Sequence, residues 1–242
     1  GSGLGGRPEQ KKIPEKPGKI MRRQAVSSVL CSLASYYERG LHETLQVGSD
    51  RKTRYISPPP CGTLPKHESS LALTEKNPKD IAVSFYYFHH SASFLEDPGT
   101  FEEFLDKFLE GKLAFGKWTD HIKSWKNAKL RDRIIYITYE EMKEDLPAVV
   151  RSLSSFLGKN LSDEVIHKIA HHCSFDVMKN NPMSNFSLVP KIYIDHEKSP
   201  FLRKGVTGDW KNHFTSEQLR RFCSTIKKEM EGESFTLPWS LD

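Results

Sequence analysis

Residues 70-SLALTEKNPKDIAVSFYYF-88 decide the fold, because they read as a short strand that runs directly into a helix. The strand is predicted at residues 70–74. Asn77 can cap the helix, Pro78 suits its first position, and Asp80 lies near the positive end of the helix dipole. The apolar residues that follow continue the helix. A strand that leads into a helix is the repeating unit of an α/β sheet protein.

The segment 133-RIIYIT-138 is the other strong strand candidate. It is continuous, rich in β-branched residues and short, which is typical of a buried parallel strand, so we expect it at the centre of the sheet. Further helices are predicted at residues 100–109 with Thr100 as cap, 117–127, 146–157, 162–173 with Ser162 as cap, and 216–229 with Ser216 as cap. The alternation predicts an α/β fold: a parallel sheet flanked by helices.

The first 74 residues have a different character. Residues 1–22, rich in Gly, Pro, Lys and Glu, are predicted to be a disordered tail. A helix is predicted at residues 24–45, and the prolines and glycine of residues 46–69 predict a loop. The predicted domains are therefore a tail at 1–22, an atypical region at 23–74 and the main domain at 75–242.

Composition narrows the class of protein. The chain has 242 residues, 37% hydrophobic and 28% charged, with a net charge of +5, enough for one α/β domain with a real core. No run of residues is apolar enough to cross a membrane, and residues 1–19 lack the apolar part of a secretion signal, so a cytoplasmic protein is expected. The charge mildly favours anionic partners but is no nucleic-acid signature.

Cysteine and histidine give no metal signature. The four cysteines, Cys31, Cys61, Cys173 and Cys223, lack C-x-x-C spacing and are expected to be reduced thiols. The adjacent pairs His89-His90 and His171-His172 would point in different directions on a helix, so ordinary histidine positions are favoured over a metal site.

Three segments could build an anion site. Residues 76-KNPKD-80 lie at a helix start, where free N–H groups bind phosphate well, and Ser84 adds a hydroxyl one turn further on. Residues 203-RKGVTGDW-210 place two cations beside a glycine. Tyr139 follows a strand, where ligands of open α/β sheets bind. The plain alternatives are a well-capped helix, a solvated basic loop and a packed tyrosine.

Four segments in this order resemble the cytosolic sulfotransferases, which use 3′-phosphoadenosine 5′-phosphosulfate. They are 76-KNPKDIAVSFYYF-88, 139-YEEMKE-144, 174-SFDVMKNNPM-183 and 199-SPFLRKGVTGDWK-211. The resemblance runs from about Glu75 to Leu237, and its last motif is the most specific. It implies a P-loop-like sulfotransferase fold that is incomplete on its amino-terminal side.

The resemblance also implies cofactor-binding roles. Lys76 stands where the family has an arginine that contacts the 3′-phosphate, and Ser84 matches a second contact. Lysine keeps the charge but loses the bidentate fork of arginine. Arg203, Lys204 and Gly205 match the loop that clasps this phosphate.

The adenine end of the cofactor is implied by three further residues. Tyr139 and Phe175 match residues that line the adenine pocket. Cys173 stands where the family usually has threonine.

The amino-terminal region departs from the family. No segment of residues 1–74 resembles the family's Thr-Tyr-Pro-Lys-Ser-Gly-Thr-Thr-Trp loop, which holds the 5′-phosphosulfate. The family's Lys-Thr-His segment, whose histidine is the general base, has its best counterpart at Lys52-Thr53-Arg54. Lys52 is therefore the candidate catalytic residue, whereas Arg54, which is always protonated, cannot act as a base.

The function that the resemblance implies is transfer of a sulfuryl group from 3′-phosphoadenosine 5′-phosphosulfate to the hydroxyl or amino group of a small molecule, which is a phenol, an alcohol or an amine. No metal is implied. Because the loop and base are not found, little or no turnover by this chain is expected. The alternative is a non-catalytic paralogue or splice product that acts as a nucleotide-binding or interaction protein, and a nucleic-acid binder is a weaker third. Residues 211–220 match the family's dimer segment poorly, so a family-style homodimer is not favoured.

Overall fold

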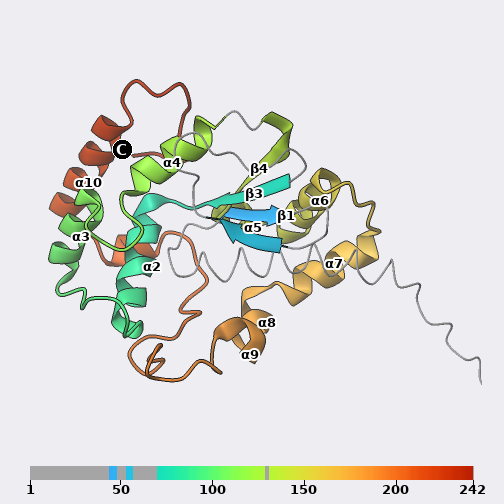
Figure 1. The fold of residues 1–242 in the computed structure, drawn as a ribbon, viewed down its shortest axis with the longest axis horizontal. Coiled ribbons are helices and arrows are strands. Elements are labelled where there is room, and N and C mark those ends of the chain that lie inside the picture. Colours follow the sequence, from blue (N-terminus) through green and yellow to red (C-terminus); the bar gives the residue numbers. More distant parts are fainter. Residues whose placement is uncertain (1–43, 48–52, 57–69, 129–130, 242) are drawn as a thin grey trace, which may run out of the picture.

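The computed structural model describes residues 44–47, 53–56, 70–128 and 131–241. A small sheet lies between two groups of helices, so the predicted α/β class is confirmed (Figure 1). The strands are β1 (Thr44–Val47), β2 (Thr53–Ile56), β3 (Ser70–Glu75) and β4 (Ile134–Thr138), in the sheet order β2-β1-β3-β4. β3 and β4 are parallel, with Leu73 opposite Tyr136, whereas β1 is antiparallel to both β2 and β3.

Two predictions about the sheet were wrong. A central, buried strand was predicted at residues 133–138. Instead, β4 lies at an edge of the sheet that the described residues form, and most of its side chains are half-buried. An unbroken apolar run indicates that both faces of a strand are covered, not that a strand lies on each side. In addition, Thr44 and Leu45 belong to a strand instead of the predicted helix end, and β1 and β2 occupy parts of the predicted loop. The rest of that helix and the predicted tail lie outside the described residues.

The helices cover the two faces of the sheet (Figure 1). One group comprises α2 (Pro78–Ser91), α3 (Phe101–Glu110), α4 (Trp118–Lys126) and α10 (Ser216–Glu229). The other comprises α5 (Tyr139–Glu144), α6 (Leu146–Phe156) and α7 (Asp163–His172). The short helices α8 (Phe175–Lys179) and α9 (Pro182–Asn185) lead into a long irregular segment that returns to α2.

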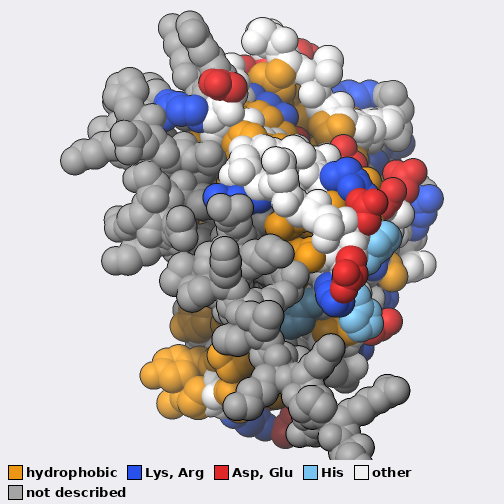
Figure 2. Space-filling model, turned by 90° about the vertical axis from the view of Figure 1, so that its right-hand side faces the viewer, with side chains coloured by type: hydrophobic (Ala, Val, Ile, Leu, Met, Phe, Trp, Pro, Cys, Tyr) orange, Lys and Arg blue, Asp and Glu red, His pale blue; other side chains and the backbone are white. Residues whose placement is uncertain are grey.

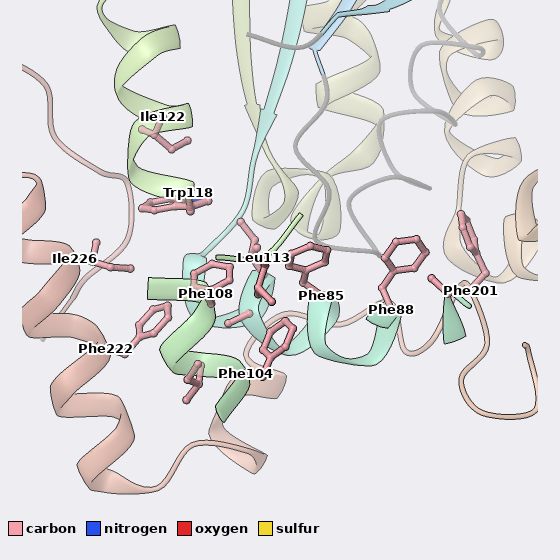
Figure 3. Close-up of a cluster of buried hydrophobic side chains, with 14 of the residues drawn as sticks. Phe85, Phe88, Phe104, Phe108, Leu113, Trp118, Ile122, Phe201, Phe222 and Ile226 are labelled. Atoms are coloured by element: carbon pink, nitrogen blue, oxygen red, sulfur yellow. The ribbon is translucent and has the colours of Figure 1, made fainter. Parts of the chain in front are cut away.

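Successive side chains of β3 point to opposite faces of the sheet, so the strand contributes to a hydrophobic core on each face. Leu71 and Leu73 are fully buried against Trp125 of α4, whereas Ala72 packs with Ile137 and the α5–α7 side. The larger cluster joins α2, α3, α4 and α10, and Figure 3 shows its aromatic side chains. This packing fixes α2, whose first turns carry the candidate site.

Local capping chemistry sets the helix starts. The Asn77 side chain accepts a hydrogen bond from Lys79 N at 3.0 Å, and Thr100 forms a capping box with Glu103, so both predicted caps are confirmed. The predicted cap Ser216 is wrong: Thr215 is the cap, and Gln218 completes its capping box. Ser162 occupies the cap position of α7 without a side-chain bond.

Acidic and basic side chains are interspersed on the face that carries α6 and α7 (Figure 2). Exposed ion pairs lie there, including Arg151–Asp163 and Lys168–Glu164. Such pairs contribute little to stability. Among the helices of the described ranges, none is both long and apolar enough to cross a membrane.

Candidate functional site

The site begins with a carboxylate at the start of α2. Asp80 is buried, and its two oxygens accept hydrogen bonds from Gly208 N at 2.6 Å and Trp210 N at 2.9 Å. Beside it, Lys79 Nζ donates to the Ser240 carbonyl at 3.0 Å and lies 4.4 Å from the centre of the Trp210 ring. The first turn of α2 therefore holds the 203–210 loop in place.

Asp209 holds the two cations of that loop. Arg203 Nη2 donates to Asp209 Oδ2 at 2.6 Å, and Lys204 Nζ donates to Oδ1 at 2.7 Å. Burial alone would raise the pKa of Asp209, but the hydrogen bonds from Lys204, Arg203 and Asn212 outweigh it and keep the pKa far below its ordinary value. Asp209 is thus a fixed anion that orders both cations.

Arg203 and Ser84 line a small hollow in the surface, together with Tyr87, Ser91 and Ser199, which we call the cation hollow. Lys76 Nζ donates to Ser84 Oγ at 3.2 Å from the buried side. The enclosed part is about 10 Å³, the space of roughly one water molecule, and it opens to solvent. The structure therefore brings Lys76, Ser84 and Arg203 together. Lys204, whose side chain is 46% exposed, instead donates to the other oxygen of Asp209.

A second, larger cavity of about 210 Å³ lies at the end of β4, and we call it the aromatic cavity. Its lining includes Tyr139, Cys173 and Phe175, the three residues implied for the adenine pocket, and also Met142 and Met178. Tyr139 and Cys173 are almost completely buried. Cys173 and Cys223 are free thiols, whereas Cys31 and Cys61 lie outside the described residues.

Two contacts join the hollow to the cavity. Lys76 Nζ lies 4.3 Å from the centre of the Tyr139 ring while it donates to Ser84. On the other side Gly205, with φ +66°, lies so close to Phe175 that a β-carbon there would be 2.3 Å from the ring. A planar group in the cavity and an anion at the hollow would therefore be neighbours.

The candidate catalytic residue is not placed by the structure. Lys52 lies outside the described residues, and Arg54 lies in β2 opposite Gln46. Within the described ranges, no group of three or more His, Cys, Asp or Glu side chains is placed to hold a metal ion.

Sequence reasoning missed the residues that support the cations. Asp80 was expected to stabilise the helix end, yet it anchors a loop 128 residues away. Asp209, Tyr87 and His213 were not singled out. The only signal for Asp209 was its place after Gly208, beside two cations.

Cations at a helix start, beside an aromatic cavity at the carboxyl end of a parallel strand, are an arrangement of an α/β protein that suits an anionic ligand with a flat group. Comparison with known proteins places the chain more narrowly. The family model described as "Sulfotransferase domain" matches residues 65–234. The chain belongs to the sulfotransferase family, in agreement with the resemblance of its four motifs.

Individual relatives agree. Sulfotransferase 1 family member D1 of Rattus norvegicus is 45% identical over 166 residues, covering 69% of this chain and 56% of the relative. Human sulfotransferase 2B1 is 45% identical over 167 residues, covering 69% and 46%. The chain thus spans about half the length of these curated relatives.

Solved structures show the same fold. Mouse sulfotransferase SULT7A1 complexed with PAP is similar with a TM-score of 0.59 and 33% identity, over 67% of this chain and 59% of that one. Retinol dehydratase in complex with androsterone and inactive cofactor PAP gives a TM-score of 0.64 and 26% identity, over 69% and 49%.

Proposed function

We propose that the chain binds the 3′-phosphoadenosine end of 3′-phosphoadenosine 5′-phosphosulfate. The observation that carries this proposal is the meeting of Lys76, Ser84 and Arg203 at one hollow that adjoins the aromatic cavity. The 3′-phosphate would lie at the cation hollow, and the adenine would lie against Tyr139 and Phe175. Both of the solved structures to which the chain is similar are complexes with PAP, the product nucleotide.

The reaction proposed for the family site is sulfuryl transfer in the cytoplasm. The bound cosubstrate would supply the sulfuryl group. An oxygen or nitrogen of a small molecule forms a bond to sulfur and gives up its proton, while the bond from sulfur to the 5′-phosphate oxygen breaks and 3′-phosphoadenosine 5′-phosphate leaves. Lys76, Ser84 and Arg203 would bind and orient the nucleotide. That contact is the same in the ground and transition states, so it favours binding and not the rate of the chemical step.

Turnover by this chain is proposed to be little or none. Rate acceleration needs preorganised donors at the bridging oxygen, and loss of one such donor typically costs roughly 10² to 10³ in rate. Residues 1–74 contain no segment like the family's phosphosulfate loop, and the best counterpart of the family's base is Arg54, which cannot accept a proton. Nucleotide binding without transfer is also what the non-catalytic alternative requires.

Calorimetry with 3′-phosphoadenosine 5′-phosphate and with adenosine 5′-monophosphate tests the binding proposal. We expect the nucleotide with the 3′-phosphate to bind at least about 10-fold more tightly, since it adds charge-assisted hydrogen bonds. Equal affinities would overturn the proposal.

A separate assay tests turnover. Purified protein is incubated with labelled cosubstrate and a panel of phenols, alcohols and amines. Rates near those of intact relatives would show that a phosphosulfate site exists and would overturn the proposed inactivity.

A further inference from the structure

Arg203 is held on two sides. One edge of its guanidinium donates to Asp209 Oδ2 at 2.6 Å, and its central carbon lies 4.4 Å from the centre of the Tyr87 ring. The side chain is only 14% exposed, so these contacts leave it little freedom to rotate. The guanidinium has five N–H donors, and the bond to Asp209 uses one of them. Donors therefore stay available on the side of the cation hollow.

Tyr87 is in turn held by a histidine. The Tyr87 hydroxyl lies 3.0 Å from His213 Nε2, and His213 Nδ1 lies 2.9 Å from the Asp209 carbonyl oxygen. A carbonyl oxygen only accepts, so Nδ1 must carry the proton. In the neutral ring Nε2 is then the acceptor, and the Tyr87 hydroxyl donates to it.

These contacts close a ring of four residues. Arg203 contacts Asp209, Asp209 contacts His213 through its backbone, His213 contacts Tyr87, and Tyr87 returns to Arg203. Tyr87 comes from α2, whereas the other three come from the 203–213 segment. The ring therefore fixes the position of the arginine relative to Ser84, which lies one turn before Tyr87 on the same helix.

We propose that Tyr87 and His213 are positioning residues that hold Arg203 in place for the 3′-phosphate and so set the preference for nucleotides that carry it. The inference rests on the proposed function. Its physical basis is preorganisation: an arginine that is already ordered loses less conformational freedom when the anion binds. Neither residue is expected to touch the phosphate with its polar atom.

The neighbouring tyrosine provides a matched control. Tyr86 packs its ring against Phe101 and Phe104, and its hydroxyl donates to the Gly99 carbonyl at 3.1 Å. The Tyr86 ring also packs edge-on against Tyr87. Tyr86→Phe therefore removes the same atom from the same helix but keeps this ring contact and every contact within the ring of four residues.

The test compares affinities for 3′-phosphoadenosine 5′-phosphate and adenosine 5′-monophosphate by calorimetry. In Tyr87→Phe and His213→Leu, we expect the preference for the first nucleotide to fall about 3- to 10-fold, the value of one hydrogen bond. Tyr87→Leu also loses the ring under the guanidinium and should lower the preference by roughly 10- to 30-fold. Tyr86→Phe should keep the wild-type preference.

The double variant Tyr87→Phe/His213→Leu sharpens the test. Both substitutions break the same link, so the double variant should lose no more than the worse single variant. A purely structural role would weaken both nucleotides equally and leave their ratio unchanged, which would overturn the inference. If Tyr87→Leu does not fold, Tyr87→Phe decides, because it keeps the ring. A wild-type protein without any preference would instead refute the proposed function.

Discussion

The cation hollow and the aromatic cavity are built in opposite ways. The hollow joins side chains from α2 with side chains more than 100 residues later. The Asp209 carboxylate holds its arginine, and the Asp80 carboxylate anchors the loop that follows the arginine. Among the residues that the structure describes, those lining the cavity all lie between Tyr139 and Met178, and most are apolar or aromatic. A site for charge needs a framework of opposite charges, since a buried cation without a partner is costly. A site for a flat, weakly polar group needs only neighbouring helices.

Breaking the Asp80 anchor should give the largest effect. Asp80→Ala leaves the Gly208 and Trp210 N–H groups without their charged acceptor, so the free energy of unfolding should fall by about 3 kcal/mol. Chemical denaturation measures this. Asp163→Ala, which removes an exposed ion pair with Arg151, is the control and should change stability little. Equal, small losses for both variants would mean that Asp80 does not organise the hollow.

Removing the arginine should affect binding more than folding. Arg203→Ala should make the binding free energy of 3′-phosphoadenosine 5′-phosphate less favourable by about 1.5 to 3 kcal/mol, the range for hydrogen bonds to a charged group. This corresponds to a loss of affinity of roughly 10- to 150-fold. Calorimetry with this nucleotide gives the value. Arg221→Ala, on α10 and paired with Glu102 and Asp106, should leave the affinity unchanged. If the affinity of Arg203→Ala for this nucleotide changed less than twofold, the cation hollow would not be part of the binding site.

Two glycines test the junction between hollow and cavity. Gly205 and Gly208 both have positive φ, so alanine strains the backbone at each by about 1 to 2 kcal/mol. Only at Gly205 does a new β-carbon meet Phe175, whereas at Gly208 nothing lies within 4 Å. We expect Gly205→Ala to lower the free energy of unfolding by at least about 1 kcal/mol more than Gly208→Ala does, and to lower the affinity for the nucleotide more. Adding Phe175→Leu to Gly205→Ala should recover part of the stability that the clash with the ring costs. Equal losses of stability in Gly205→Ala and Gly208→Ala would contradict the close contact between Gly205 and Phe175.

Low pH should weaken the contacts that hold the cation hollow together, because these depend on the charge of Asp209, whereas no carboxylate is among the described residues that line the aromatic cavity. The pKa of Asp209 is lowered in the folded state, so its contribution to stability is present above the ordinary aspartate pKa, near 4, and is lost as the pH falls below that value. Asp209→Asn should therefore be less stable than wild type at pH 7, and the gap should narrow toward pH 2. Denaturation curves at both pH values measure it, and a gap that widens in acid would refute the sign.

The smallest effect is expected in the aromatic cavity. Cys173→Thr places the residue that the family usually has at this position into a site where the thiol is 2% exposed. A buried hydroxyl costs about 1 kcal/mol unless it finds a partner, and the affinity for the nucleotide should change less than about threefold. Calorimetry and thermal denaturation check both values. A tenfold loss of affinity would mean that the cavity recognises its ligand as specifically as the hollow does.

Local chemistry made much of the fold predictable. Asn77 and Thr100 cap helices through neighbours within three residues, and the apolar pattern of residues 133–138 indicated a strand. The position of β4 at the sheet edge was not predictable, because pairing depends on residues far away in the sequence. The strand β2 was hidden by the prolines and glycines of residues 46–69, and the first two residues of β1 fell within the predicted helix at residues 24–45.

The candidate site was predictable only in part. The family resemblance named Arg203, Lys204 and Gly205, but the partners of these residues depend on tertiary contacts that no sequence spacing encodes. Asp80 suits a helix start whether or not a distant loop docks on it. His213 gave no signal, since its link to Tyr87 exists only after the 203–213 segment has folded against α2.

The contact between Lys79 and the Ser240 carbonyl has a consequence for protein synthesis. A ribosome makes the chain from its amino end, and Ser240 follows Lys79 by 161 residues. While the chain is being translated, α2 exposes its charged first turn without the loop and the carbonyl that later cover it. A chain arrested before Gly208 could form β3 and α2 but could not satisfy Asp80. The surroundings of Lys79 and Asp80 are therefore complete only after the chain through Ser240 has left the ribosome.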